Sequence, residues 1–416
     1  MTGARTGAAR AAGEGDGRER AEALDAADRL APYRDRFVTG DPRVIYLDGN
    51  SLGRLPRDAA ERLRRVVDVE WGERLVRSWD EGWMDLPTRI GDLIGRELLG
   101  ARPGEVAVAD STSVNFYKLC VAGVEARPGR RAIVTDRDNF PTDRYVAEGI
   151  ARAKGLELRW IDGDPVDGPR PADVEAALDG GVALVTLSHV AYRTSAIADM
   201  AAITALAHRA GALTLWDLSH AAGSVPVDLT GTGADLAVGC TYKYLNGGPG
   251  APAFLYVRSE LQGGLRQPIW GWLGRRDPFE MAQGFEPAGG ATTFLSGTPP
   301  VLSLVAVEDG VRMLAEAGIG RLRAKGIALT EYAVELFDRW LVPLGFTLGC
   351  PRDPARRGSH VLFRHERARK LYQGLLNSGV IADYREPQGI RMGLAPLTTR
   401  FVDVHDGLAA LTDLAS

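Results

Sequence analysis

Six short apolar runs recur along the middle of this 416-residue chain, with helical patterns between them. The runs are Val106–Ala109, Ala132–Thr135, Leu156–Trp160, Val182–Leu187, Leu213–Trp216 and Leu236–Val238. Each has the length of a buried strand, and the helical periodicity is clearest at Met200–Arg209. Strands that alternate with helices predict an α/β fold whose mostly parallel sheet has helices on both faces. A further run, Ala253–Val257, follows the sixth too closely for a crossover helix, so we expect it to pair antiparallel.

The sixth run leads into the tetrapeptide Thr241-Tyr242-Lys243-Tyr244 and a glycine-rich turn. A lysine among small and hydroxyl-bearing residues suits an ammonium whose pKa must fall before it acts as an amine. The fifth run ends in Asp217, with His220 close behind. A carboxylate there can keep a pyridinium nitrogen protonated, which makes pyridoxal phosphate (PLP) an electron sink. A lone lysine is usually solvated and a lone aspartate is often a helix cap, but the three residues in this order favour a PLP enzyme.

The composition excludes several other classes of protein. The chain is 45% hydrophobic, and its net charge of −4, with both signs interspersed, provides no basic surface for nucleic acid or for a membrane. No stretch reaches the roughly 20 apolar residues that span a bilayer. The three cysteines, Cys120, Cys240 and Cys350, are widely spaced and predict neither a disulfide framework nor a metal site. We therefore expect a cytoplasmic protein without a metal.

Changes in composition divide the chain into four parts. Residues 1–20 are rich in Ala, Gly and Arg and lack the apolar centre of a signal peptide, so we expect a disordered tail. The other predicted parts are an N-terminal segment that joins the small domain (21–75), a large PLP-binding domain (76–300) and a small α+β C-terminal domain (301–416). Within the large domain, the Gly-, Pro- and Trp-rich stretch Gln262–Pro300 is interpreted as a long functional loop.

Four blocks of sequence, at residues 46–53, 139–143, 216–223 and 269–272, resemble the kynureninase family. They read Tyr-Leu-Asp-Gly-Asn-Ser-Leu-Gly, Asn-Phe-Pro-Thr-Asp, Trp-Asp-Leu-Ser-His-Ala-Ala-Gly and Ile-Trp-Gly-Trp. The resemblance, to the bacterial type, extends in order over most of the chain. It implies the transferase-like fold type I of PLP enzymes, in which a large, mostly parallel seven-stranded sheet domain is followed by a small α+β domain.

The resemblance also implies a set of cofactor contacts. These are Thr112, Ser113, Phe140, Pro141, Thr142, Asp143, Ser188, Asp217, His220, Tyr242, Lys243, Trp272 and Thr298. Thr112 and Ser113 follow a strand and would hold the phosphate at a helix N-terminus, although either could equally be an N-cap. By resemblance, Phe140 stacks on the pyridine ring. Trp272 and Thr298 would reach the phosphate from the partner subunit of a homodimer with shared active sites.

The implied reaction is the hydrolysis of L-kynurenine, with 3-hydroxykynurenine as a second substrate, in tryptophan catabolism. The products are anthranilate, or 3-hydroxyanthranilate, and L-alanine. The expected catalytic residues are Lys243, Tyr242 and Asp217. The expected substrate-binding residues are Arg391, Asn50, Ser51, Trp79 and Gly297. Arg391 lies in an apolar run, and its planar guanidinium suits the α-carboxylate. Trp79, Gly297 and Thr298 resemble the pocket of bacterial enzymes that prefer the unsubstituted ring.

Three other functions remain open at this stage. A cysteine desulfurase needs a nucleophilic cysteine on a mobile loop, and Cys350, expected in an exposed turn, is the one loose candidate. An aminotransferase would share the fold and the lysine. A PLP-binding regulator would carry a fused nucleic-acid-binding segment, and none is visible in the sequence.

Overall fold

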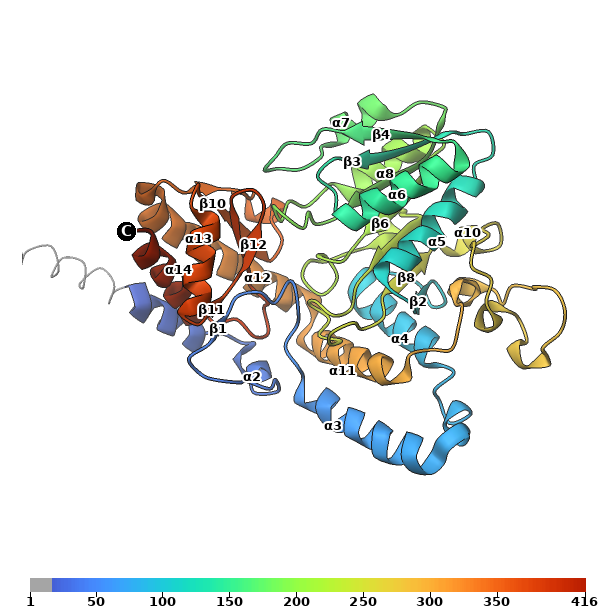
Figure 1. The fold of residues 1–416 in the computed structure, drawn as a ribbon, viewed down its shortest axis with the longest axis horizontal. Coiled ribbons are helices and arrows are strands. Elements are labelled where there is room, and N and C mark those ends of the chain that lie inside the picture. Colours follow the sequence, from blue (N-terminus) through green and yellow to red (C-terminus); the bar gives the residue numbers. More distant parts are fainter. Residues whose placement is uncertain (1–16) are drawn as a thin grey trace, which may run out of the picture.

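The computed structural model describes residues 17–416, which form two lobes (Figure 1). The tail predicted at residues 1–20 lies outside the described residues as far as residue 16. Residues 17–26 are helical, so the prediction is wrong for residues 17–20. The reason is packing, since Ala21 of this helix is fully buried in the core of the C-terminal lobe.

Seven strands form the large sheet in the order β2-β8-β7-β6-β5-β3-β4. Their bounds are β2 (Val106–Val108), β3 (Ala132–Asp136), β4 (Glu157–Ile161), β5 (Val182–Ser188), β6 (Leu213–Asp217), β7 (Leu236–Gly239) and β8 (Phe254–Val257). β7, β6, β5, β3 and β4 run parallel, whereas β8 pairs antiparallel with both β7 and β2. The predicted mostly parallel sheet and its antiparallel strand are confirmed.

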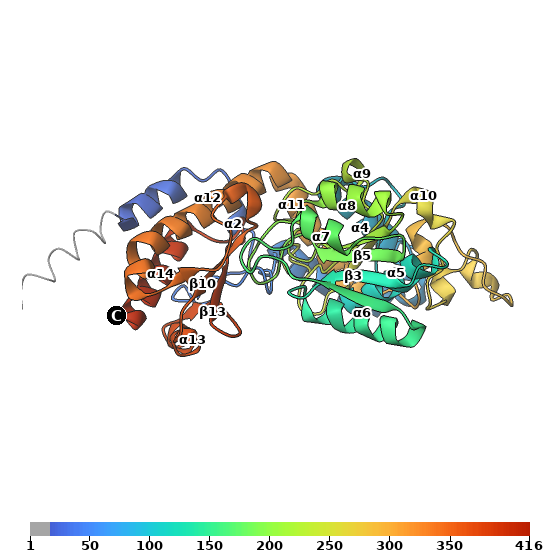
Figure 2. The same cartoon turned by 90° about the horizontal axis from the view of Figure 1, so that it is seen from above.

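Alternate side chains of each strand enter two cores, one on each face of the sheet. Ile133 and Leu184 pack with α5, whereas Val134 and Val185 belong to the core that holds α8 and α11. The helices of this lobe are α4 (Leu86–Ile94), α5 (Thr112–Glu125), α6 (Pro141–Lys154), α7 (Pro171–Ala177), α8 (Met200–Arg209), α9 (Leu229–Thr232), α10 (Ser259–Gln262) and α11 (Val301–Ala317). Figure 2 shows β3 and β5 between α6 on one side and α8 on the other.

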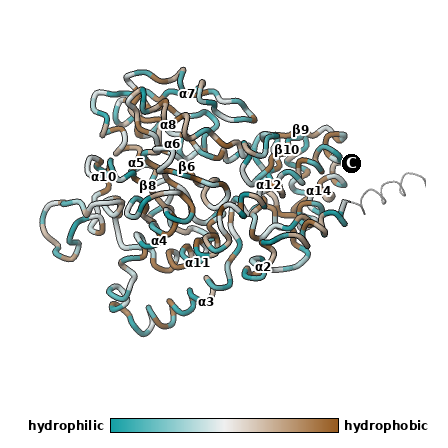
Figure 3. The backbone as a smooth tube through the Cα atoms, turned by 180° about the vertical axis from the view of Figure 1, so that it is seen from behind, coloured by the Kyte–Doolittle hydropathy of each residue, from teal (hydrophilic) through white to brown (hydrophobic). Residues whose placement is uncertain are grey.

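The C-terminal lobe is built on an antiparallel sheet of order β12-β13-β10-β9 and a parallel pair, β1-β11. Its elements are β1 (Ile45–Tyr46), α12 (Ile319–Leu336), β9 (Thr347–Leu348), β10 (His360–Arg364), α13 (Ala368–Asn377), β11 (Val380–Ile381), β12 (Asp383–Arg385), β13 (Gly389–Gly393) and α14 (Phe401–Ala415). The short helix α2 (Ala31–Arg34) precedes them, and its Tyr33 packs against the core of the large lobe. Because β1 pairs with β11, residues from both ends of the chain share one core. Figure 3 shows hydrophobic stretches inside both lobes.

The border between the two cores lies later in the chain than residue 301, where the sequence predicted it. α11 is packed into the core of the large lobe through Leu304, Val307 and Val311, and it contacts α3 (Arg57–Arg65) and α4. The core changes within α12, where Leu322 still belongs to the large lobe and Leu329 to the C-terminal lobe. The sequence of an apolar helix does not indicate which of two cores the helix will pack into. The boundary between the two lobes is therefore set by tertiary packing.

Short π- and 3-10 helices complete the chain. The π-helices are η1 (Val66–Arg74), η3 (Gly95–Leu99) and η7 (Phe337–Leu341). The 3-10 helices are η2 (Leu75–Trp79), η4 (Trp272–Gly274), η5 (Pro278–Glu280), η6 (Gly290–Phe294), η8 (Val342–Leu344) and η9 (Pro354–Arg356). The stretch predicted as a long loop, Gln262–Pro300, therefore contains three single turns.

The segment at residues 47–53 joins the two lobes. Gly393 of β13 donates its amide to the Leu47 carbonyl at 2.7 Å, and Gly53 donates to the Tyr242 carbonyl at 2.8 Å. A Cβ at Gly53 would lie 2.3 Å from the Lys243 carbonyl oxygen, so only glycine permits this approach. The segment therefore holds the C-terminal sheet against the loop that contains the lysine.

We predict that Gly53→Ala destabilises the protein by about 1–3 kcal/mol, because the added methyl group pushes the segment off the Lys243 loop. Gly40→Ala is the matched control, since a Cβ at Gly40 meets no atom within 4 Å. Urea unfolding of both variants, followed by fluorescence, measures the difference. Equal midpoints for the two variants would contradict the role of this close approach.

Candidate active site

The carboxyl ends of the parallel strands bring the predicted residues to one edge of the sheet. Ser188 ends β5, Asp217 ends β6, and the register pairs these two residues directly. The loop after β7 carries Lys243, and the turn after β3 leads into Phe140. Ligands of open α/β sheets bind at this edge, so the topology collects side chains that are far apart in the sequence.

Lys243 lies in the centre of this group and is 8% exposed. Its Nζ atom lies 3.0 Å from Nε2 of His220 and 5.8 Å from the ring centroids of both Phe140 and Tyr242. Burial raises the pKa of Tyr242, with a further contribution from the neighbouring Cys240. The Tyr242 hydroxyl consequently keeps its proton and is available as a proton donor.

Two buried carboxyl groups, Asp143 and Asp217, lie beside each other below this lysine. Asp143 is 2% exposed and Asp217 is 5% exposed. The Ser219 amide donates to Oδ1 of Asp217 at 2.8 Å, whereas Oδ2 of Asp143 has no partner among residues 17–416. Burial and then the charge of Asp217 hold the pKa of Asp143 well above its usual range. A cation placed at this pair would relieve the repulsion.

The first turn of α5 provides a candidate anion site. Ser111 is the N-cap, and its Oγ accepts from the Val114 amide at 3.4 Å. Thr112 and Ser113 lie inside the helix, so they are not the caps, and both are half-buried. Asp110, in the turn before this helix, has a left-handed backbone conformation with φ 52°. The Nζ atom of the buried Lys118 donates a hydrogen bond to Oδ2 of Asp110 at 2.6 Å. Hydroxyls and amides at such a helix start suit a phosphate.

The block at residues 139–143 opens α6. Phe140 is the N-cap and Pro141 the first helical residue, with Thr142 next to it. Asn139 accepts a hydrogen bond from Ser188 Oγ at 2.7 Å and another from the Phe140 amide at 2.8 Å. Asn139, which has no role predicted from the sequence, therefore links the start of α6 to the end of β5.

Arg391 of β13 enters the site from the C-terminal lobe and is 1% exposed. It donates to Ser51 Oγ at 2.9 Å, to the Asp383 carboxylate and to the Tyr192 carbonyl. With its amide oxygen turned toward the guanidinium, Asn50 accepts from Nε of Arg391 at 3.1 Å. The predicted substrate residues Asn50, Ser51 and Arg391 therefore meet. Asp383 and Tyr192 were missed because they come from distant segments with no motif of their own.

Four predicted residues lie elsewhere in the same chain. Trp79 and Thr298 line a groove of about 460 Å³ together with Trp71 and Trp83. The exposed Gly297 precedes Thr298, and Trp272 packs against Phe279 with ring centroids 5.8 Å apart. Figure 1 shows the gold segment that carries Trp272 and Thr298 at the edge of the large lobe, away from the junction between the lobes. One chain therefore does not bring them to Lys243.

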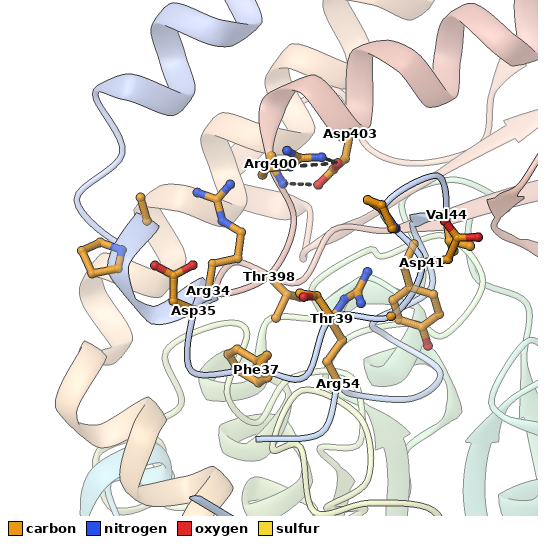
Figure 4. Close-up of a pocket in the computed structure, with 15 residues that line it drawn as sticks. Arg34, Asp35, Phe37, Thr39, Asp41, Val44, Arg54, Thr398, Arg400 and Asp403 are labelled. Carbon is orange, nitrogen blue, oxygen red and sulfur yellow. Dashed lines mark hydrogen bonds and ion pairs between the residues drawn. The ribbon is translucent and has the colours of Figure 1, made fainter. Parts of the chain in front are cut away.

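A cavity of about 830 Å³ lies apart from this site, between the N-terminal segment and the start of α14 (Figure 4). Arg34, Arg54 and Arg400 are among its lining residues, and none of the predicted site residues lines it. Arg400 is already paired with Asp403.

No helix within residues 17–416 has the length and apolarity needed to cross a membrane.

Cys350 is buried rather than exposed, which corrects the expectation from its Gly/Pro/Arg surroundings. It is 1% exposed and belongs to the core of the C-terminal lobe. Burial raises the pKa of its thiol. A buried thiol of this kind is inert, so the structure has no desulfurase nucleophile at this position.

The comparisons with known proteins agree with this geometry. Residues 322–411 match the family model described as the kynureninase C-terminal domain. The chain is 47% identical over 404 residues to a kynureninase of Burkholderia pseudomallei, with 95% of each chain covered. It is 45% identical over 399 residues to a kynureninase of Pseudomonas fluorescens, with 94% of each chain covered.

Solved structures define the wider class. A cysteine desulfurase from Thermococcus onnurineus superposes with a TM-score of 0.77 at 19% identity, covering 89% of this chain and 94% of that one. The cystine lyase C-DES, in a variant with glycine linked to its PLP cofactor, gives a TM-score of 0.78 at 17% identity, covering 91% and 98%. The fold is therefore that of the fold type I PLP enzymes. Within this class, the chain belongs to the kynureninase family.

Buried histidines make the folded protein sensitive to acid. Burial lowers the pKa of His189 to about 4. A histidine that is neutral when folded binds its proton more readily after unfolding, so its contribution to stability is complete above about pH 6.5 and falls toward pH 4. We expect the urea midpoint to fall over this range and to fall less in His189→Gln. Identical pH profiles for the two proteins would contradict this prediction.

Proposed function

We propose that this protein is a PLP-dependent kynureninase that hydrolyses L-kynurenine to anthranilate and L-alanine. The observation that carries the proposal is the group of Lys243, His220 and Asp217 at the strand ends, in a chain 47% identical to a kynureninase. The site residues named below are part of the proposal. The preference for an unsubstituted ring and the cytoplasmic location, which rests on three unpaired cysteines, remain predictions.

The residues present fit the cofactor at both of its ends. The paired carboxyl groups of Asp143 and Asp217, one with an unsatisfied oxygen, suit a protonated ring nitrogen. The hydroxyls of Thr112 and Ser113 at the start of α5 suit the phosphate. Phe140 would stack on the ring from the side of α6. Bound there, PLP supplies an electron sink for the bond that breaks at the substrate.

The chain's own residues handle the substrate's charges and protons. Arg391, already oriented by Asp383 and Ser51, binds the α-carboxylate. The free amine of Lys243 takes the proton from the substrate Cα, and His220 orients that amine through its Nε2 atom. The Asp217 carboxylate would pair with the ring nitrogen. These roles place the α-carbon between Lys243 and the C-terminal lobe.

Cleavage of the Cβ–Cγ bond adds one water to the substrate. The hydroxyl goes to Cγ, which leaves as the carboxylate of anthranilate, and a proton goes to Cβ, which becomes the methyl group of alanine. Tyr242 is our candidate for the acid that protonates the γ-carbonyl oxygen, since burial raises the pKa of its hydroxyl and keeps the proton in place. No thiol is needed in this route.

We propose a homodimer in which each site is completed by the partner. The surface around the groove at Trp79 exposes large apolar side chains, with Trp71 at 56%, Leu75 at 57% and Val76 at 74%. The loop that carries Trp272 exposes Trp270 at 62% and Phe279 at 64%. Contiguous apolar surface of this kind is typical of protein interfaces. A second copy seated there would receive Trp272 and Thr298 at its own cofactor site.

We expect Asp217→Asn to lower kcat for kynurenine by several powers of ten while KM changes little. A neutral amide cannot keep the ring nitrogen protonated, and each power of ten is about 1.4 kcal/mol of barrier. Asp228→Asn is the matched control, because Asp228 caps α9 on the surface. Anthranilate fluorescence and alanine release measure turnover. Activity within about tenfold of the wild type would overturn the role of Asp217.

Mixed dimers test the shared site. A Lys243→Ala subunit and a Trp272→Ala/Thr298→Val subunit should each form poorly active homodimers. After random mixing, half of the dimers are hybrids, and each hybrid has one intact site, so about a quarter of wild-type activity should return. A mixture that stays as inactive as its components would contradict the contribution in trans.

A further inference from the structure

A second imidazole, His360, lies beside the one that contacts Lys243. His220 is in the turn after β6, and His360 is the first residue of β10 in the C-terminal lobe. Their ring centroids are 5.3 Å apart, with 55° between the ring planes. His220 is 5% exposed and His360 is fully buried. The two rings therefore face each other where the lobes meet.

Three nitrogen atoms of this histidine pair have no hydrogen-bond partner in the described part of the chain. His220 uses Nε2 toward Lys243, but its Nδ1 is unpartnered, as are both nitrogens of His360. A neutral imidazole has one N–H donor and one acceptor nitrogen. Leaving such a group buried without a partner destabilises the folded protein. Unpartnered ring nitrogens also occur on the buried His189 and His405, but His220 and His360 are the pair whose rings lie side by side next to Lys243.

Burial and the neighbouring cations both lower the pKa values of the two rings. Burial is the main reason that the pKa values of His220 and His360 lie well below their usual range. The charged side chains that face the rings are Lys243, Arg391 and Arg385, and each of these cations lowers both pKa values further. With protonation excluded, the remaining variable is which ring nitrogen carries the hydrogen.

The contact with Lys243 determines which ring nitrogen of His220 carries the hydrogen. A lysine ammonium can only donate, so while Lys243 carries its proton, Nε2 accepts and the ring hydrogen is on Nδ1. That N–H points to no acceptor in residues 17–416. His360 is the neighbouring ring with free nitrogens, and its place is rigid because its strand pairs with β13.

We propose that His360 is a positioning residue for His220, and that one water bridges Nδ1 of His220 to a ring nitrogen of His360. The bridge holds the His220 ring in the tautomer and orientation that direct Nε2 at Lys243. The inference rests on the proposed function only in what Lys243 does with its proton. Buried waters bond to otherwise unsatisfied polar groups of this kind, typically with about two to four polar partners.

Two substitutions at His360 test the bridge in the holoenzyme. His360→Phe fills the space but removes both nitrogens, and we expect kcat to fall by about 10- to 100-fold with little change in KM, because a misplaced catalytic group costs that much. His360→Gln has a donor and an acceptor and should recover most of the loss. His405→Phe, in the same lobe and also buried, is the control. A His360→Phe enzyme with wild-type kcat would overturn the proposal.

A second readout needs no cofactor. The chain has six histidines, so the apoenzyme labelled with [15N]histidine can be assigned by solid-state NMR from single variants. We expect His220 to be one tautomer, protonated at Nδ1, in the wild type and in His360→Gln, and a mixture in His360→Phe. An unchanged His220 spectrum in His360→Phe would overturn this inference alone, whereas a wild-type enzyme inactive on kynurenine would overturn the proposed function.

Discussion

The hydrogen bond from the Gly53 amide to the Tyr242 carbonyl is the contact on which the arrangement of the site depends. It belongs to a segment that also bonds β13 through Leu47, so it fixes the C-terminal lobe relative to the reactive lysine. The segment carries Asn50 and Ser51 to the Arg391 guanidinium. If this segment moved, Arg391 and Lys243 would no longer keep their present positions relative to each other.

The charges of the site are organised in two buried groups. Asp143 and Asp217 form an acidic pair at the start of α6 and the end of β6. Lys243, Arg391 and Arg385 form a basic group toward the C-terminal lobe, in which both arginines contact Asp383. A ligand with a cationic ring and an anionic carboxylate matches both groups. Such a ligand would place a charge of opposite sign beside each buried group, which lowers the cost of burying those charges.

Large apolar side chains are exposed on the surface of the large lobe. Trp71, which lines the groove with Trp79, is 56% exposed, and Trp270, in the loop that carries Trp272, is 62% exposed. In the dimer that we propose, the partner's surface would cover these side chains and exclude water from each site. The same contact would then stabilise the fold and complete the chemistry.

The sequence by itself determined the strands, the antiparallel β8 and the polar residues at the strand ends. Apolar runs are local patterns, and a lysine or aspartate that ends such a run is carried to the edge of the sheet whatever the rest of the chain does. Family motifs added Asn50, Ser51 and Arg391. Only the tertiary structure decided that His360, Asp383 and Tyr192 join the site, that α11 belongs to the large core and that Cys350 is buried. These facts depend on contacts between segments far apart in the chain, and no local pattern records which distant surface a side chain will meet.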